Sequence, residues 1–222
     1  QEVLQRIPDQ RLIVLRHATN QGVGGAMKTG FAKALELEAE IIVKVDGDGQ
    51  MNPALIGRLV SPILRHQADY AKGARFFETR VLYHMPIARL LGNLGLSFVA
   101  KLVSGYWNVL DPANGFIAIH RQVLERLPLE ALSNDFFFET DMLIQLYYIQ
   151  ATIADVQLPA RYGDEQSSLS PLHVLISFPG KLAAALLKRI LWRYFILDFT
   201  ACSLFLVFGL LLFWGGVSFG AV

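Results

Sequence analysis

Residues 40–53 read EIIVKVDGDGQMNP, and this stretch decides the fold. Its first part, Glu40–Val45, is a short apolar run that predicts a buried strand. The loop Asp46–Gln50 follows, and Asn52 and Pro53 then supply an N-cap and a first helical position for a helix. A strand, an acidic loop and a capped helix in this order indicate an α/β sheet, in which ligands lie beyond the carboxyl ends of strands.

Strands and helices alternate on both sides of this stretch. Arg11–Arg16 predicts a buried strand, Ala26–Leu37 a helix and Asp69–Gly73 a third short strand. Later patterns predict, in order, a helix, a strand, a helix and a strand within Tyr83–Tyr106, Phe116–Ile119, Phe136–Tyr148 and Thr152–Pro159. The alternation predicts an α/β fold with a mostly parallel sheet covered by helices on both faces.

The C-terminal part of the chain is strongly apolar. No charged residue occurs from Phe199 to Val222, a run long enough to cross a hydrocarbon core about 30 Å thick. We therefore predict a transmembrane helix over residues 198–222, with a buried core helix as the alternative.

A cationic and aromatic segment precedes this run. It contains Lys181, Lys188, Arg189 and Arg193, and no acidic residue interrupts them before Asp198. Residues 171–197 are therefore predicted to form an amphipathic helix along the membrane interface, or else an ordinary surface helix. By the positive-inside rule, we expect this flank and the domain before it, residues 1–170, to face the cytoplasm.

The overall composition excludes several other functions. The net charge of +1 provides no basic field for nucleic acid. The single cysteine, Cys202, excludes a disulfide framework and a cysteine-based zinc site within one chain.

Asp46 and Asp48 are the strongest chemical signal. Two carboxylates one residue apart at a strand end can face a common site, and Gly47 and Gly49 let the backbone bend close to a ligand. Carboxylate oxygens suit Mg²⁺ or Mn²⁺, and Gln50 can add a carbonyl oxygen. The alternative is a solvated acidic turn without a ligand.

Four motifs in order carry a family resemblance: NQGVGGAMKTGFAKA at 20–34, VDGDGQMNP at 45–53, YAKGARF at 70–76 and DPANGF at 111–116. Together they resemble the family 2 glycosyltransferases of the GT-A fold, in particular the dolichol- and polyprenyl-phosphate sugar synthases with C-terminal membrane helices. The resemblance covers nearly all of residues 11–170. It implies a metal-dependent, inverting transfer from a nucleotide-sugar to a membrane lipid acceptor, with polyprenyl phosphate as the expected acceptor.

The resemblance also implies roles for individual residues. It implies that Asp46, Asp48 and Gln50 bind the metal and help to bind the donor, and that Asp48 is also catalytic. Arg75 and, by a looser alignment, Arg89 resemble phosphate-facing arginines, whose paired donors suit phosphate oxygens.

On the acceptor side, the motif implies roles for Asp111, Gly115 and Phe116. Glu139 and Asp141 fall where many inverting relatives keep an acidic residue that activates the acceptor as a base. A hydroxyl acceptor needs such a base, whereas an ionised phosphate does not, so the sequence leaves both mechanisms open.

Three departures from the family pattern bear on these expectations. The family's opening strand and its nucleobase-binding acids would precede Gln1, so we expect the GT-A fold to be incomplete at its N-terminus. Val23 stands where a basic residue is frequent, and Asn114 replaces a small hydroxyl residue. The sequence also stops in its first span, whereas many relatives carry two or more.

Competing functions remain. The glycines at 22, 24 and 25 suggest a dinucleotide fold, but Met27 breaks the G-x-G-x-x-G spacing. A processive polysaccharide synthase would carry Gln-x-x-Arg-Trp, which the Trp192-Arg193 region lacks. A non-catalytic membrane scaffold of the same fold stays open.

Overall fold

The computed structural model describes residues 9–75, 87–112, 114–135, 137–159 and 171–220. Its strands are β1 (Ile41–Lys44), β2 (Tyr70–Arg75), β3 (Ile117–His120) and β4 (Ile153–Leu158). The α-helices are α2 (Gly22–Glu36), α3 (Ile56–Leu64), α5 (Ile87–Ser104), α6 (Arg121–Leu124), α7 (Phe138–Tyr148), α8 (Pro171–Leu191) and α9 (Ala201–Gly220). Short 3₁₀ turns are η1 (Pro53–Leu55) and η2 (Leu129–Ala131), and η3 (Trp192–Leu197) is π-helical.

The described strands form one sheet in the order β1-β3-β2-β4. β3 pairs antiparallel with both β1 and β2, and only β2 and β4 are parallel. The α/β prediction is confirmed. β1, β2 and β4 run in one direction and β3 runs opposite to them, so the sheet is mixed. β3 comes after α5 and enters the sheet between two strands that both run opposite to it, an arrangement that local patterns do not encode.

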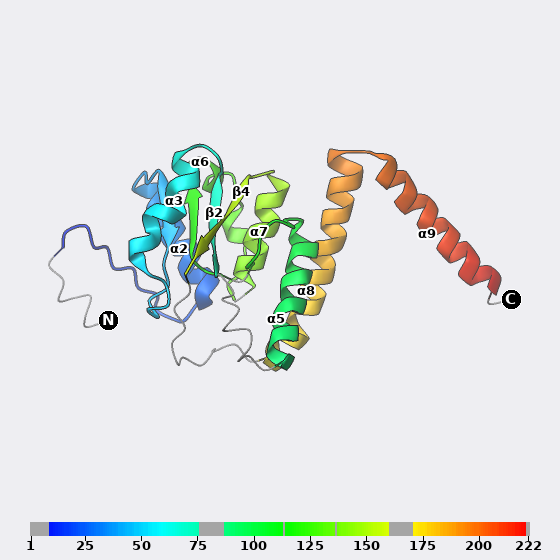
Figure 1. Cartoon of the computed structure of the whole chain (residues 1–222), viewed down its shortest axis with the longest axis horizontal. Helices are drawn as coiled ribbons and strands as arrows, with labels where there is room; N and C mark the ends of the chain where they lie inside the picture. The colour runs from blue at the N-terminus through cyan, green and yellow to red at the C-terminus, as the bar shows by residue number, and fades with distance from the viewer. Residues whose placement is uncertain (1–8, 76–86, 113, 136, 160–170, 221–222) are drawn as a thin grey trace.

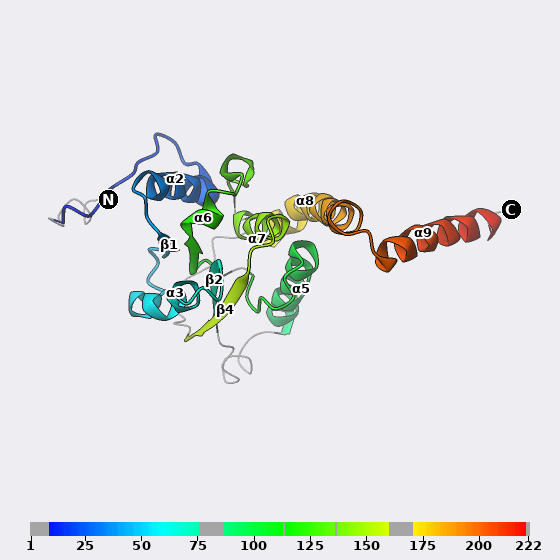
Figure 2. The same ribbon diagram turned by 90° about the horizontal axis from the view of Figure 1, so that it is seen from above.

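Helices cover both faces of the sheet (Figures 1 and 2). On one face α3 buries Leu59 and Ile63 against Ala71, Ala118 and Val156. Asn52 caps the preceding turn as predicted, because its Oδ1 accepts a hydrogen bond from the Ala54 N–H at 3.1 Å.

On the other face, α2 and α7 cover the sheet. Phe31 of α2 and Phe138 and Met142 of α7 pack with Tyr70 and Ile119 in the larger hydrophobic cluster. Side chains alternate between the two faces along each strand, so Tyr70 points to the α7 side and Ala71 to the α3 side. This alternation determines which polar side chains lie beneath α7.

The predicted strand Arg11–Arg16 is not a strand in the structure. Its residues are exposed, with Leu12 to Leu15 between 37% and 45% accessible. A strand needs a hydrogen-bonding neighbour, and no strand of the described chain pairs with this segment. The apolar run identified a segment suited to burial but could not supply the partner strand.

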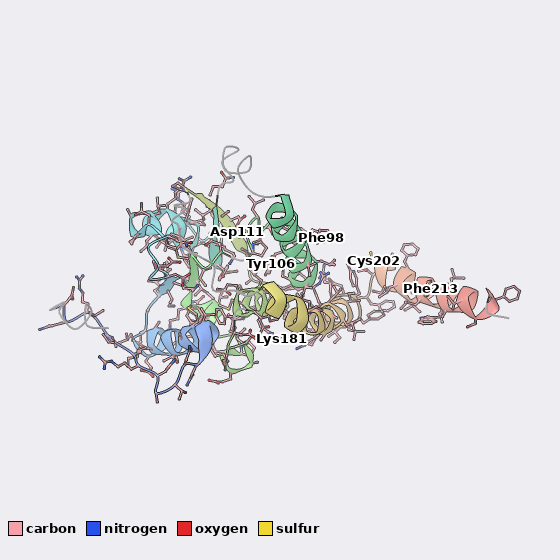
Figure 3. All side chains as sticks on the ribbon, turned by 90° about the horizontal axis from the view of Figure 1, so that it is seen from below. Phe98, Tyr106, Asp111, Lys181, Cys202 and Phe213 are labelled. Atoms are coloured by element: carbon pink, nitrogen blue, oxygen red, sulfur yellow. The ribbon has the colours of Figure 1, made fainter. Side chains whose placement is uncertain are left out.

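The C-terminal helices lie beside and beyond the α/β domain. α8 packs on α5 and α7, with Leu182, Ala185 and Leu186 against the buried residues Val103 and Ile144. After η3, α9 points away from the sheet, and Phe213 lies along it far from Asp111 (Figures 1 and 3). α9 is the one described helix long and apolar enough to cross a membrane, and 6% of its most apolar window is buried.

Candidate active site

The acidic loop lies at the carboxyl end of β1. Asp46 is partly buried, while Asp48 is exposed and its Oδ1 accepts a hydrogen bond from the Gln50 N–H at 3.0 Å. Gly49 has a φ of +79°, a left-handed conformation that a side chain would strain. The turn therefore directs one carboxylate inward and leaves the other accessible at the surface.

Beneath α7, a row of four side chains crosses the sheet. Lys44 of β1 and Lys72 of β2 are both paired with Ile117 of β3, and Lys72 is also paired with Asp155 of β4. Lys44 is 8% exposed and Lys72 is fully buried. Strand spacing separates the two lysine backbones by about 10 Å. Two ammonium groups therefore lie on the α7 side of the sheet, among side chains of the hydrophobic core.

Lys44 joins the acidic loop to α7. Its Nζ lies 3.0 Å from Asp46 Oδ1 and 3.1 Å from Asp46 Oδ2, and it donates to Glu139 Oε1 at 3.5 Å. The Glu139 side chain is 16% exposed and that of Asp46 36%. One buried ammonium therefore holds two carboxylates that are far apart in sequence.

Gly115 closes this arrangement from the side of β3. A Cβ at this position would lie 2.3 Å from Lys44 Nζ and 2.6 Å from Asp46 Oδ2. A side chain here would displace both charged groups, so the missing Cβ is what admits the ion pair. The structure thus brings Gly115 and Asp46 together, two residues that the sequence assigned to opposite substrates.

The residues around Gly115 are fixed by buried hydrogen bonds. Asn114 Oδ1 accepts from the Phe116 N–H at 3.0 Å, and the Lys72 ammonium donates to the Asn114 carbonyl. Phe116 is 4% exposed and packs in the α3-side core, and Asp111 is also buried. Gly115 borders the site, whereas the ring of Phe116 belongs to the core. The Asp111 carbonyl accepts a hydrogen bond from the Asn114 N–H at 3.2 Å.

Burial shifts the pKa values of two groups in the row. It lowers the pKa of Lys72 from its ordinary value of 10.5 to about 8, although the negative charge of Glu139 opposes the shift. Burial also raises the pKa of Asp155, whose Oδ2 accepts from the Leu110 N–H at 2.6 Å. Desolvation of the sheet interior thus dominates over the attraction between these opposite charges.

Glu139 and Asp141 occupy different environments on α7. Glu139 faces Lys44, as described above. Asp141 Oδ2 accepts a hydrogen bond from the Ser133 N–H at 2.9 Å, and its Oδ1 lies 3.5 Å from Gln145 Nε2. Of the two acids, Glu139 borders the acidic loop, while Asp141 stabilises the turn before the helix.

Other predicted site residues are only partly described. Arg75 is the last residue of β2 and Arg89 lies near the start of α5, but both side chains lie outside the described part of the structure. Residues 161–170 also lie outside it.

The donor set of the acidic loop fits a hard divalent cation. Asp46 and Asp48 offer carboxylate oxygens and Gln50 an amide oxygen, which are the ligand types of Mg²⁺ and Mn²⁺. Among the described residues, no group of three or more His, Cys, Asp or Glu side chains could hold a metal. The two carboxylates of this loop match the type of site in which one or two protein carboxylates hold Mg²⁺ together with substrate phosphates.

The glycine cluster near the start of α2 has a packing role. A Cβ at Gly24 would lie 2.1 Å from the Ser133 carbonyl oxygen, and one at Gly22 would lie 2.4 Å from that of Asn134. The Gly24 N–H donates to the Asn134 carbonyl at 2.9 Å. These glycines let α2 approach the turn before α7, and this contact accounts for the pattern that suggested a dinucleotide site.

Sequence reasoning missed Lys44, Lys72 and Asp155. Strand alternation was the available signal, because the apolar positions of Glu40–Val45 and Asp69–Gly73 place these lysines on the inward face. A lysine at such a position indicates a buried counter-charge.

Comparison with known proteins identifies the family. Residues 1–128 match the family model of Glycosyl transferase family 2. The chain therefore belongs to glycosyl transferase family 2, as the four motifs indicated.

Similar characterised proteins act on lipid phosphates, according to their names. The chain is 33% identical over 168 residues to the UDP-N-acetylglucosamine–dolichyl-phosphate N-acetylglucosaminyltransferase of Methanococcus voltae, covering 76% of this chain and 66% of that protein. It is 26% identical over 151 residues to the undecaprenyl-phosphate mannosyltransferase of Micrococcus luteus, covering 68% and 61%. The chain thus spans less than two thirds of the length of either protein.

Solved structures share the fold. Glucosyl-3-phosphoglycerate synthase of Mycobacterium tuberculosis, in complex with Mn²⁺, uridine diphosphate and phosphoglyceric acid, matches with a TM-score of 0.51 and 26% identity. The match covers 80% of this chain and 55% of that one. The likeness supports a GT-A-like α/β fold with a mixed sheet.

Proposed function

We propose that this chain transfers a sugar from a nucleotide-sugar to the phosphate of a membrane lipid. The observation that carries the proposal is the convergence of the acidic loop, Gly115 and Glu139 on Lys44 at one edge of the sheet. The same chain carries α9, a helix of membrane-spanning length. Relatives named for dolichyl-phosphate and undecaprenyl-phosphate support a lipid phosphate as acceptor.

Donor binding falls to the acidic loop and two arginines. Asp48, with Asp46 and Gln50, would hold Mg²⁺ or Mn²⁺, and the bound cation supplies positive charge to the diphosphate leaving group. Arg75 and Arg89 would donate paired hydrogen bonds to phosphate oxygens. The Mn²⁺ and uridine diphosphate in the structurally similar synthase support this assignment.

The proposed chemistry is a single displacement with inversion. An oxygen of the acceptor phosphate forms a bond to the anomeric carbon while the bond from that carbon to the diphosphate oxygen breaks. The acceptor approaches the site from the side of Asp111 and Gly115. Because the acceptor phosphate is already ionised, no proton has to be removed, and Glu139 can remain paired with Lys44.

The membrane arrangement follows from the charge pattern. We assign residues 1–170 to a catalytic domain, 171–197 to an interfacial segment and 198–222 to the span. Lys188 and Arg189 lie at the end of α8 and face the cytoplasm under the positive-inside rule. The lipid acceptor then reaches the site from the same leaflet.

The test is transfer of label from radiolabelled nucleotide-sugars into the lipid fraction, in membranes that contain the protein and a short-chain polyprenyl phosphate. Asp48→Asn should abolish metal-dependent transfer, whereas Asp9→Asn, a matched change at an exposed carboxylate, should not. Full transfer by Asp48→Asn would contradict the metal role. The absence of any transfer by the unmodified protein would favour a non-catalytic scaffold.

A second candidate is transfer to a hydroxyl group of a glycan or glycolipid. The position of Glu139 at the site favours it, because a hydroxyl acceptor requires a nearby base. Glu139→Gln distinguishes the two: loss of transfer by 100-fold or more indicates a hydroxyl acceptor. Retention of transfer to polyprenyl phosphate supports the phosphate acceptor.

A further inference from the structure

The carboxylate of Asp46 is occupied by an internal cation. Both of its oxygens lie within 3.1 Å of Lys44 Nζ, and the Lys44 side chain is 6% exposed. An ammonium group has three protons to donate, and Glu139 Oε1 lies 3.5 Å from the same nitrogen. The buried lysine therefore binds Asp46 where a divalent cation would otherwise bind it.

The surroundings keep the ammonium group in this position. A Cβ added to Gly115 would lie 2.3 Å from Lys44 Nζ, so the backbone at Gly115 leaves no free space on that side of the ammonium group. Asp46 is also fixed by its backbone, since its N–H contacts Met51 Sδ at 3.3 Å. Lys44 cannot move toward the β3 side without a collision.

Asp48 differs from Asp46 in its environment. It is exposed, and its Oδ1 accepts a hydrogen bond from the Gln50 N–H at 3.0 Å within the loop. A divalent cation at this loop therefore meets one accessible carboxylate and a second carboxylate whose charge Lys44 neutralises. Through an effective dielectric near 20, one unit charge several ångströms from a divalent cation changes the cation's affinity by more than tenfold.

We propose that Lys44 is a positioning residue that occupies Asp46 and keeps the affinity of the free protein for divalent cations low. Cation binding then depends on a nucleoside diphosphate, whose phosphate oxygens supply the missing negative ligands. The proposal deepens the proposed function and rests on its assignment of the cation to the Asp46–Gln50 loop.

The experiment measures Mn²⁺ binding by electron paramagnetic resonance, with the whole protein in detergent, with and without uridine diphosphate. The unmodified protein should bind Mn²⁺ weakly alone and at least tenfold more tightly with the nucleotide. Lys44→Met should bind Mn²⁺ alone at least tenfold more tightly than the unmodified protein. Its enhancement by uridine diphosphate should fall by a similar factor.

Three further variants serve as controls. Lys33→Met removes an exposed positive charge on α2 and should leave the Mn²⁺ affinity within twofold. Lys44→Arg, which keeps the charge, should restore weak binding. In an Asp46→Asn background, Lys44→Met should no longer increase the affinity, because the gain requires the released carboxylate.

The outcomes separate this inference from the proposed function. If Asp48→Asn leaves Mn²⁺ binding unchanged with the nucleotide present, the cation site itself is wrong. If Asp48→Asn removes binding but Lys44→Met does not increase the affinity without nucleotide, only the role of Lys44 is wrong. If Lys44→Met does not fold, the Asp46→Asn variant decides. If Asp46→Asn binds Mn²⁺ alone with an affinity within threefold of that of the unmodified protein, the result supports the occupation of Asp46 by Lys44. A larger loss of affinity overturns the proposal.

Discussion

Lys72 makes the stability of this protein depend on pH in an unusual direction. Burial lowers its pKa from 10.5 to about 8, so the native state releases a proton more readily than the unfolded chain. Between these two values the unfolded chain binds more protons, and the free energy of unfolding therefore rises with pH. The difference of 2.5 pKa units, 10.5 minus 8, corresponds to about 3 kcal/mol, of which about 2 kcal/mol is regained between pH 7 and pH 9.5.

Urea denaturation in detergent, followed by circular dichroism at pH 7 and pH 9.5, measures this gain. Lys72→Met should remove the increase, because the methionine side chain has nearly the same length but no proton to exchange. Burial also raises the pKa of Tyr70 and Tyr106, which lowers stability above pH 10. Those phenols are present in both proteins, so they cancel in the comparison. The same pH dependence in both proteins would refute the assignment of a buried, easily deprotonated lysine.

The contact between α2 and the turn before α7 makes Gly24 and Gly30 a matched pair. Gly24→Ala places a Cβ 2.1 Å from the Ser133 carbonyl oxygen and should destabilise the protein by about 2 kcal/mol. The Cβ of Gly30→Ala meets no atom within 4 Å, so this change should stabilise α2 by about 0.5–1 kcal/mol. Thermal unfolding of the two variants measures the difference, and equal midpoints would contradict the close approach. Asp141→Ala removes the acceptor of the Ser133 N–H and should cost about 1–3 kcal/mol of stability while transfer is retained within a fewfold. A large loss of transfer by folded Asp141→Ala would instead assign the role of catalytic base to Asp141.

The local elements were predictable where their signals are local. The cap at Asn52 and the strands that became β1, β2, β3 and β4 follow from side-chain chemistry over a few residues. The family motifs identified the glycosyltransferase family, which the comparison confirms. The predicted strand at Arg11–Arg16 was wrong because a run of apolar residues does not specify a pairing partner.

The distinction between Glu139 and Asp141 could not be read from the sequence. The two acids are two residues apart on one helix, and either could have faced the site. Their environments differ because Glu139 contacts Lys44 of β1 and Asp141 contacts the Ser133 backbone before the helix, and both partners lie outside α7.

Several features could be read from the sequence alone: the acidic loop after a short strand, the α/β class, the family and the long apolar C-terminal run. Each of these depends on composition or spacing within a short window, where side-chain periodicity and turn chemistry act. Only the tertiary structure decided that β3 lies between β1 and β2. That pairing sets Lys44 and Lys72 on either side of Ile117 and brings Gly115 against Asp46. Contacts between distant segments depend on strand order and register, which no local pattern specifies.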